Sequence, residues 1–231
     1  LLVASFLNPH DICLESSTNL SSEIIGKKEG KKSLITQCVR QMRARAAAID
    51  SVEFYREHAP ALPFNFAKTD GFPDMKKSPY KDFPDWYWRK YRWTYGQLVA
   101  LVDSHIGHIL DALDRHPELK RNTIIVFTSD HGEMQGAHHT VTKNLPYDEC
   151  QRVPFIFCGR GIAHGERDNS LVCNGTDLLP TICQLAGIPL PAKTDGLSLA
   201  DRVLGRGKAP QRKALYTEGD GFLNVISGTN K

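Results

Sequence analysis

The sequence has 231 residues, of which 41% are hydrophobic and 24% are charged, and these values are ordinary for a globular protein that buries a core. Its 29 basic and 26 acidic residues give a net charge of +3 at pH 7, which indicates no nucleic-acid partner. The densest basic stretch, residues 27–32, is interrupted by Glu29, so we interpret it as a solvated loop. No segment approaches the roughly 20 apolar residues of a membrane helix.

The cysteines show no C-x-x-C spacing, which argues against a zinc site and against a dithiol redox motif. The sequence leaves open whether one or two disulfides form. The chain begins with Leu1 instead of Met, and its first apolar run is too short for a signal peptide, so we expect the true N-terminus to be missing. The six cysteines are Cys13, Cys38, Cys150, Cys158, Cys173 and Cys183.

The first third of the chain predicts a strand, a helix and a long loop. The apolar run 1–7 is stopped by Asn8-Pro9 and predicts a buried strand that leads into a loop carrying His10 and Asp11. An Ala-rich stretch within residues 34–58 favours a helix. Residues 60–84 hold five prolines and predict a long irregular connection. We expect the tryptophans that follow to anchor this loop on the core, namely Trp86, Trp88 and Trp93.

The remaining elements alternate between helices and strands. Apolar residues recur at steps of three and four from Leu98 to Leu113, which predicts a helix that Pro117 stops. Residues 123–128 (TIIVFT) and 153–158 (VPFIFC) predict buried strands, and residues 176–186 predict a helix that Gly187 ends. This alternation predicts an α/β fold with a mixed, largely parallel sheet between helices.

Ligands of such sheets bind beyond the carboxyl ends of the strands. The loop after TIIVFT concentrates carboxylate, imidazole and ammonium groups within 15 residues. A carboxylate at the end of a buried strand is costly unless a cation or hydrogen bonds compensate its charge, so this loop predicts a metal site. The charged and imidazole side chains of the loop are Asp130, His131, Glu133, His138, His139 and Lys143.

The loop and several neighbouring segments resemble the sulfatases of the alkaline phosphatase superfamily. The segments match in the order that this family requires, and the resemblance extends from Ser5 to about Leu204, so chance is a poor explanation. It implies an alkaline phosphatase-like fold and hydrolysis of a sulfate ester. The matching segments are Ser5–Asp11, Val102–Gly107, Thr128–Pro154, Asp177–Ile182, Ala186–Pro189 and Asp195–Leu199.

The resemblance also implies roles for five residues. Asp130 and His131 would ligate one divalent cation, Ca²⁺, which prefers carboxylate oxygens. Lys143 would hold the sulfate oxygens and neutralise charge that builds on the bridging oxygen. His10 would act on the leaving group, because an imidazole gains and loses a proton near neutral pH. His138 matches a position that is commonly histidine, and we expect it to belong to the substrate-binding site.

The chain departs from the family at the nucleophile. Sulfatases use a cysteine in C-x-P-x-R or C-x-A-x-R that is oxidised to formylglycine, and none of the six cysteines has that context. We therefore expect residues 1–231 to be part of a single sulfatase catalytic domain that lacks its nucleophile-bearing N-terminal segment and its C-terminal subdomain. This chain alone would be inactive.

Two other readings of the function stay open beside a sulfatase acting on a carbohydrate or small organic sulfate. One is a phosphodiesterase or phosphonate monoester hydrolase of the same superfamily, which would share the metal loop. The other is a catalytically inactive, metal-stabilised binding module. The family resemblance also favours a periplasmic or secreted protein.

Overall fold

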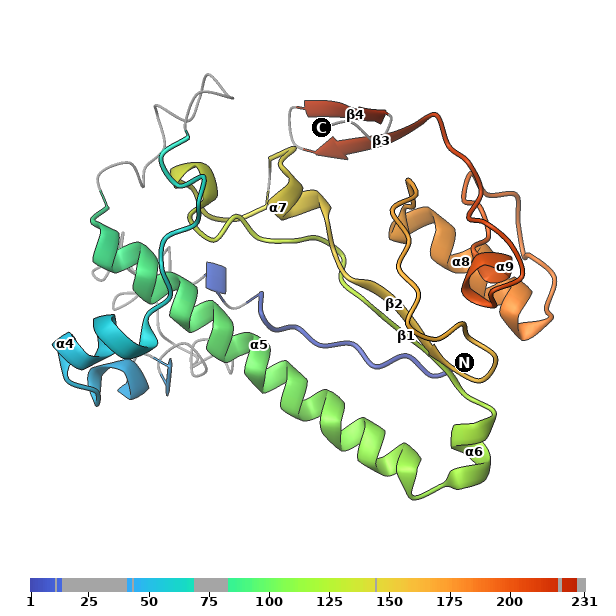
Figure 1. Ribbon diagram of the computed structural model, residues 1–231, viewed down its shortest axis with the longest axis horizontal. Helices are drawn as coiled ribbons and strands as arrows, with labels where there is room; N and C mark the ends of the chain where they lie inside the picture. Colours follow the sequence, from blue (N-terminus) through green and yellow to red (C-terminus); the bar gives the residue numbers. More distant parts are fainter. Residues whose placement is uncertain are drawn as a thin grey trace, which may run out of the picture. The chain divides into compact units, whose positions relative to one another are not determined.

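A computed structural model describes residues 1–10, 12–13, 41–42, 44–68, 83–143, 145–219 and 222–227 (Figure 1). They form two compact units. The first comprises Leu1–Ala112 and Glu133–Thr142, and the second comprises Leu113–Gly132 and Lys143–Lys231. The predicted positions Asp11 and Cys38, and most of the predicted connection between Pro60 and Pro84, lie outside the described residues.

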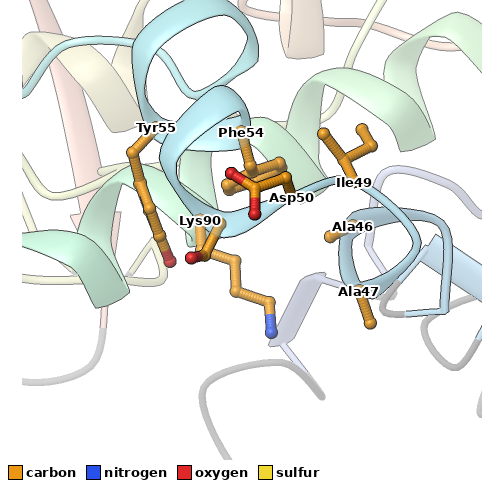
Figure 2. A pocket seen from close by; sticks show the side chains of 8 residues that line it. Ala46, Ala47, Ile49, Asp50, Phe54, Tyr55 and Lys90 are labelled. Atoms are coloured by element: carbon orange, nitrogen blue, oxygen red, sulfur yellow. The ribbon is translucent and has the colours of Figure 1, made fainter.

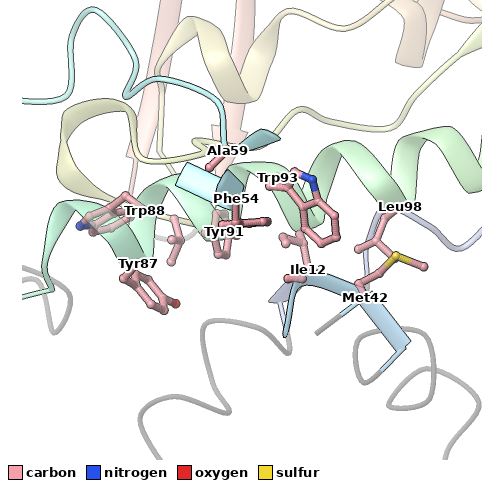
Figure 3. Close-up of a cluster of buried hydrophobic side chains, with 11 residues drawn as sticks. Ile12, Met42, Phe54, Ala59, Tyr87, Trp88, Tyr91, Trp93 and Leu98 are labelled. Atoms are coloured by element: carbon pink, nitrogen blue, oxygen red, sulfur yellow. The ribbon is translucent and has the colours of Figure 1, made fainter. Parts of the chain in front are cut away.

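Helix α5 (Asp85–Asp114) organises the first unit. Its N-terminal half buries Tyr87, Trp88, Tyr91 and Leu98, which are spaced to lie on one side of the helix. Figure 3 shows these side chains beside Phe54, Ile12 and other buried residues that come from separate segments of the chain. Aromatic side chains bury large apolar areas, so this cluster is the core of the unit.

The chain before α5 contributes short helical turns. Residues 41–42 and 44–47 are helical, which agrees with the Ala-rich prediction, and α4 (Ser51–Glu53) and the π-helical turn η1 (Phe54–His58) follow. The Asp50 carboxylate caps α4 by accepting from the backbone N–H groups of Val52 and Glu53. At the other end, Arg89 of α5 donates to the carbonyls of Tyr55, Ala59 and Pro60. Both ends of this segment are therefore capped by side chains.

Helix α5 corrects three details of the prediction. It begins 13 residues before Leu98, because the aromatic residues that precede Leu98 continue the same buried face. Trp88 and Trp93 are buried as expected, whereas Trp86 is 54% exposed because it points away from that face. Pro117 does not only end a helix, since it occupies the first turn of a new one, α6 (Pro117–Arg121).

Strands β1 (Ile124–Thr128) and β2 (Phe155–Gly159) confirm that the two apolar runs of the second unit form strands, but none of their residues is buried as predicted, because among the described strands they pair only with each other. They pair antiparallel, with Val126 opposite Phe157. The hairpin of β3 (Ala214–Gly219) and β4 (Phe222–Ser227) is also antiparallel. Among the described strands no parallel pair occurs.

Residues 1–7 do not form the predicted strand. They are exposed throughout and have no regular secondary structure. A strand requires a neighbour to accept and donate its backbone hydrogen bonds, and no described strand pairs with this segment. The prediction of a buried strand for residues 1–7 is therefore wrong for this structure.

The other helices of the second unit are short apart from α8 (Asn174–Ala186); they include α7 (Asp148–Gln151) and α9 (Ala200–Val203). Gly187 ends α8 in the left-handed conformation, at φ 66°, as predicted. The helix begins two residues earlier than predicted, with Cys173 as its N-cap. The five described cysteines, all except Cys38, form no disulfide with one another. None of the described helices is both long and apolar enough to span a bilayer.

Candidate active site

The loop after β1 begins with Asp130 and His131, and their side chains meet. Asp130 Oδ1 accepts from the backbone N–H of His131 at 2.9 Å and from Ser129 Oγ at 3.3 Å. The other oxygen, Oδ2, lies 3.3 Å from His131 Nε2. The Asp130 side chain is 81% exposed, so the carboxylate is accessible to an ion from solvent.

The donor set of these two residues fits a shared cation. His131 Nδ1 lies 2.8 Å from the carbonyl oxygen of Gly132, which can only accept, so we assign the ring proton to Nδ1. Nε2 then directs its lone pair toward Asp130 Oδ2, and two such groups attract each other only through a cation or a second ring proton. A calcium ion takes six to eight ligands. The described residues contain no group of three or more His, Cys, Asp or Glu that could complete this set.

The charge state of Asp130 suits a cation ligand. Partial burial raises the pKa of this carboxyl, but hydrogen bonds from the His131 backbone and from Ser129, together with the nearby His131 ring, lower it more. The net pKa therefore lies below the ordinary value for aspartate. The carboxylate is ionised at neutral pH without any bound ion.

A close backbone approach at Gly132 and three hydrogen bonds hold the backbone that carries this pair. A Cβ on Gly132 would lie 1.9 Å from the carbonyl oxygen of Glu149, so no other residue fits there without a backbone shift. The Gly132 N–H donates to the Cys150 carbonyl at 2.7 Å. At the end of β1, the Asn174 amide donates to Thr128 Oγ1 at 3.0 Å and to the Ser129 carbonyl at 2.6 Å. Sequence reasoning did not single out Asn174, because this contact joins positions 45 residues apart.

His138 is engaged through both ring nitrogens. Nδ1 lies 2.5 Å from the Lys68 carbonyl and therefore carries the proton, and Nε2 lies 3.1 Å from the Asn65 amide nitrogen, which donates to it. The backbone N–H of His138 also donates to the Asn65 carbonyl. Neighbouring His139 stacks on Phe66, with ring centroids 4.4 Å apart. These contacts attach the loop of residues 133–142 to residues 65–68.

The loop from residue 133 to residue 142 has a strained backbone. Gln135, His138, His139 and Thr142 all have positive φ angles, between 49° and 73°. A β-branched residue such as Thr142, at φ 73°, costs about 1–3 kcal/mol in this conformation, so other interactions must hold it there. Clusters of such residues are typical of functional sites.

Lys143 and His10, the two predicted sulfate-contacting groups, occupy different units. Lys143 directly follows strained Thr142 and is half-buried. His10 is exposed on a turn whose backbone hydrogen bonds run from His10 to Leu7 and from Cys13 to His10. Ile12, two residues on, is 2% exposed and belongs to the core of the first unit. The structure thus joins Asp130 with His131, and it anchors the His10 turn.

A cavity of about 350 Å³ lies elsewhere in the first unit (Figure 2). None of the five predicted site residues contributes to it. The Asp50 carboxylate at its wall is already used to cap α4. The lining residues are Ala46, Ala47, Ile49, Asp50, Ser51, Phe54, Tyr55 and Lys90.

Comparison with known proteins addresses the family and the fold of the chain. The sulfatase family model matches residues 2–188. The Δ4,5-hexuronate-2-O-sulfatase of Bacteroides thetaiotaomicron is 40% identical over 134 residues, which are 57% of this chain and 28% of that protein. A crystal structure from the same species, described as a candidate sulfatase, aligns with a TM-score of 0.65 and 26% identity over 93% of this chain and 52% of its own.

A third similarity concerns a different activity. The phosphonate monoester hydrolase of Silicibacter pomeroyi aligns with a TM-score of 0.58 and 28% identity, over 71% of this chain and 35% of its own. The present chain thus spans about half or less of the length of the proteins it matches. These likenesses confirm the predicted α/β, alkaline phosphatase-like fold, and because the family model covers most of its residues, the chain belongs to the sulfatase family.

Proposed function

We propose that the full-length protein hydrolyses a sulfate ester and depends on Ca²⁺ for this activity. The observation that carries the proposal is the Asp130–His131 pair, whose Oδ2 and Nε2 atoms lie 3.3 Å apart at the end of β1. Bound there, the ion would polarise the sulfate oxygens and stabilise the charge that develops on them. We propose that the remaining ligands and the formylglycine come from a part of the full-length protein outside this chain.

The chain's own residues would supply binding and proton transfer. Lys143 would bind a sulfate oxygen as a compact cation. His10 would donate a proton to the leaving-group oxygen, in keeping with its exposed position on an anchored turn. His138, whose ring is fixed by Asn65 and Lys68, would border the substrate and keep the loop attached to residues 65–68.

A sulfated sugar is the substrate class that the comparisons favour. The relative with 40% identity is named for a sulfated hexuronate, and we propose that this protein acts on a sulfate ester of a carbohydrate. A periplasmic or secreted location would give it access to such glycans. The likeness to a phosphonate monoester hydrolase supports a second candidate, in which the same site hydrolyses a phosphonate monoester.

The test compares metal dependence and substrate preference in the full-length protein. After chelation, Ca²⁺ should restore turnover of an aryl sulfate and raise the melting temperature, since a ligand at 100 times its Kd stabilises by about 2.7 kcal/mol. Asp130→Ala should lose both effects. Asp111→Ala, on the exposed face of α5, is the matched control and should keep them. Turnover of a phenyl phosphonate ester without turnover of any sulfate would favour the second candidate.

A further inference from the structure

Glu133 is a buried carboxylate to which the sequence assigned no separate role. It is 8% exposed, and one of its oxygens, Oε1, accepts three hydrogen bonds. The donors are Tyr91 Oη at 2.8 Å, the backbone N–H of Thr142 at 2.7 Å and the backbone N–H of Gln135 at 3.4 Å. Burying a carboxylate costs free energy of desolvation. The hydrogen bonds to Glu133 must offset that cost.

These contacts, with two backbone hydrogen bonds, close the loop of residues 133–142 at its base. The N–H of Met134 donates to the Thr142 carbonyl at 2.9 Å, and Thr142 in turn donates to the side chain of Glu133. A second pair, from Gly136 to Thr140 at 2.8 Å, lies just inside the first. Lys143 is the residue that directly follows this closed loop in the chain.

Thr142 is the point at which this arrangement meets the predicted sulfate-binding lysine. Its φ of 73° is unfavourable for a β-branched residue, and the Glu133 carboxylate binds the N–H of this same residue. Without that acceptor the backbone would relax toward negative φ. Lys143 is the next residue, so such a change in the Thr142 backbone would change the direction of the Lys143 side chain.

We propose that Glu133 is a positioning residue that fixes the backbone of Thr142 and so places Lys143 to bind a sulfate group. This inference rests on the proposed function, because it takes Lys143 as the anion-binding group. Tyr91, on helix α5, also donates a hydrogen bond to Glu133 and so helps to hold its carboxylate in place. Burial raises the pKa of its phenol well above the ordinary value, and the Glu133 carboxylate raises it further, so Tyr91 stays protonated and donates at all working pH values.

The experiment is a double-mutant cycle between Glu133 and Lys143 in the full-length protein, with inorganic sulfate binding measured by calorimetry and kcat/KM measured on an aryl sulfate. Glu133→Ala should weaken both by about tenfold or more, because a displacement on the order of 1 Å can cost about 100-fold. Glu133→Gln keeps an oxygen acceptor for Tyr91 and Thr142 and should retain most of the binding. In a Lys143→Ala background, Glu133→Ala should cause no further loss.

Tyr91→Phe provides a second route if Glu133→Ala does not fold. It removes one donor to the same oxygen and should produce a smaller loss that also disappears in the Lys143→Ala background. Equal losses with and without Lys143, or unchanged sulfate binding in Glu133→Ala, would overturn the inference. So would sulfate binding that does not depend on Lys143 at all. If sulfate binding shows the coupling but the wild-type protein turns over no sulfate ester, the proposed function fails and the positioning role stands.

Discussion

Asp177 and Arg212 form a buried, two-pronged ion pair in the second unit. The Asp177 side chain is completely inaccessible and that of Arg212 is 12% exposed. Arg212 Nη1 donates to Oδ2 at 2.6 Å and Nη2 donates to Oδ1. The backbone N–H groups of Cys173 and Leu197 donate to the same carboxylate, each at 2.8 Å. One side chain on α8 thereby connects three separate segments of the chain.

Removal of this carboxylate should destabilise the protein strongly. Asp177→Ala leaves the Arg212 guanidinium and two backbone donors buried without their acceptor, and breaking a buried pair costs on the order of 3–5 kcal/mol. Urea unfolding of the full-length protein should show this loss in the free energy of unfolding. The matched control is Arg121→Ala, because its partner Glu118 and Arg121 itself are both well exposed, and such pairs contribute little. A small effect of Asp177→Ala would contradict the interpretation of Asp177 as a structural anchor.

The same pair predicts how stability depends on pH. Burial raises the pKa of Asp177, but the bonds from Arg212, Cys173 and Leu197 lower it more, so its folded pKa lies below the ordinary value. A depressed pKa means that the unfolded chain binds the proton first, so the stabilisation is complete above about pH 4 and is lost as the pH falls further. Unfolding free energies measured between pH 7 and pH 2.5 should fall less steeply in Asp177→Asn than in the wild type. Parallel curves for the two proteins would contradict the assignment.

Gly132 offers a test of the backbone beside Asp130 and His131. Gly132→Ala should abolish calcium-dependent stabilisation and activity, because its Cβ would lie 1.9 Å from the Glu149 carbonyl oxygen. Gly107 lies inside α5 with no atom within 4 Å of the added methyl. Gly107→Ala should therefore raise stability by about 0.5–1 kcal/mol, the usual gain in a helix interior. Thermal melts of both variants with and without Ca²⁺ provide the comparison, and a Gly132→Ala protein with normal calcium response would show that the loop is not so constrained.

The helices and strands that could be predicted are those whose conformation is determined by their own residues. The run Ile124–Thr128 is β-branched and aromatic, and it is a strand. The early part of α5 was missed because its dense aromatic residues have modest helix propensity, and burial against Phe54 and Ile12 decides their conformation. Residues 1–7 show the converse, since a strand requires a partner that their sequence does not specify.

In the candidate site, too, contacts between neighbours in the chain could be predicted and contacts between distant residues could not. Asp130 and His131 meet because they are adjacent in the chain, so their pairing could be foreseen from sequence. Glu133 looked like one more polar loop residue, because its burial depends on Tyr91, which lies 42 positions away. Asn174 was overlooked for the same reason. The roles of His10, Lys143 and His138 toward substrate stay predictions.

The role of His10 can be separated from simple binding by varying the leaving group. His10 is exposed, while Ile12 two residues later is buried in the core, so the turn holds an accessible imidazole on a fixed base. An acid that protonates the bridging oxygen matters most when the departing alcohol is a poor leaving group. His10→Ala in the full-length protein should therefore lower kcat/KM by about 100-fold or more for an alkyl or sugar sulfate, within the range of about 10²–10⁴ for general acid catalysis. For an activated nitrophenyl sulfate the loss should be far smaller, because its phenolate departs without a proton. His58→Ala, a histidine at the end of η1 that is not in the predicted site, should leave both rates unchanged. If His10→Ala lowered kcat/KM equally on both substrates, His10 would bind the sulfate group and would not act as the acid.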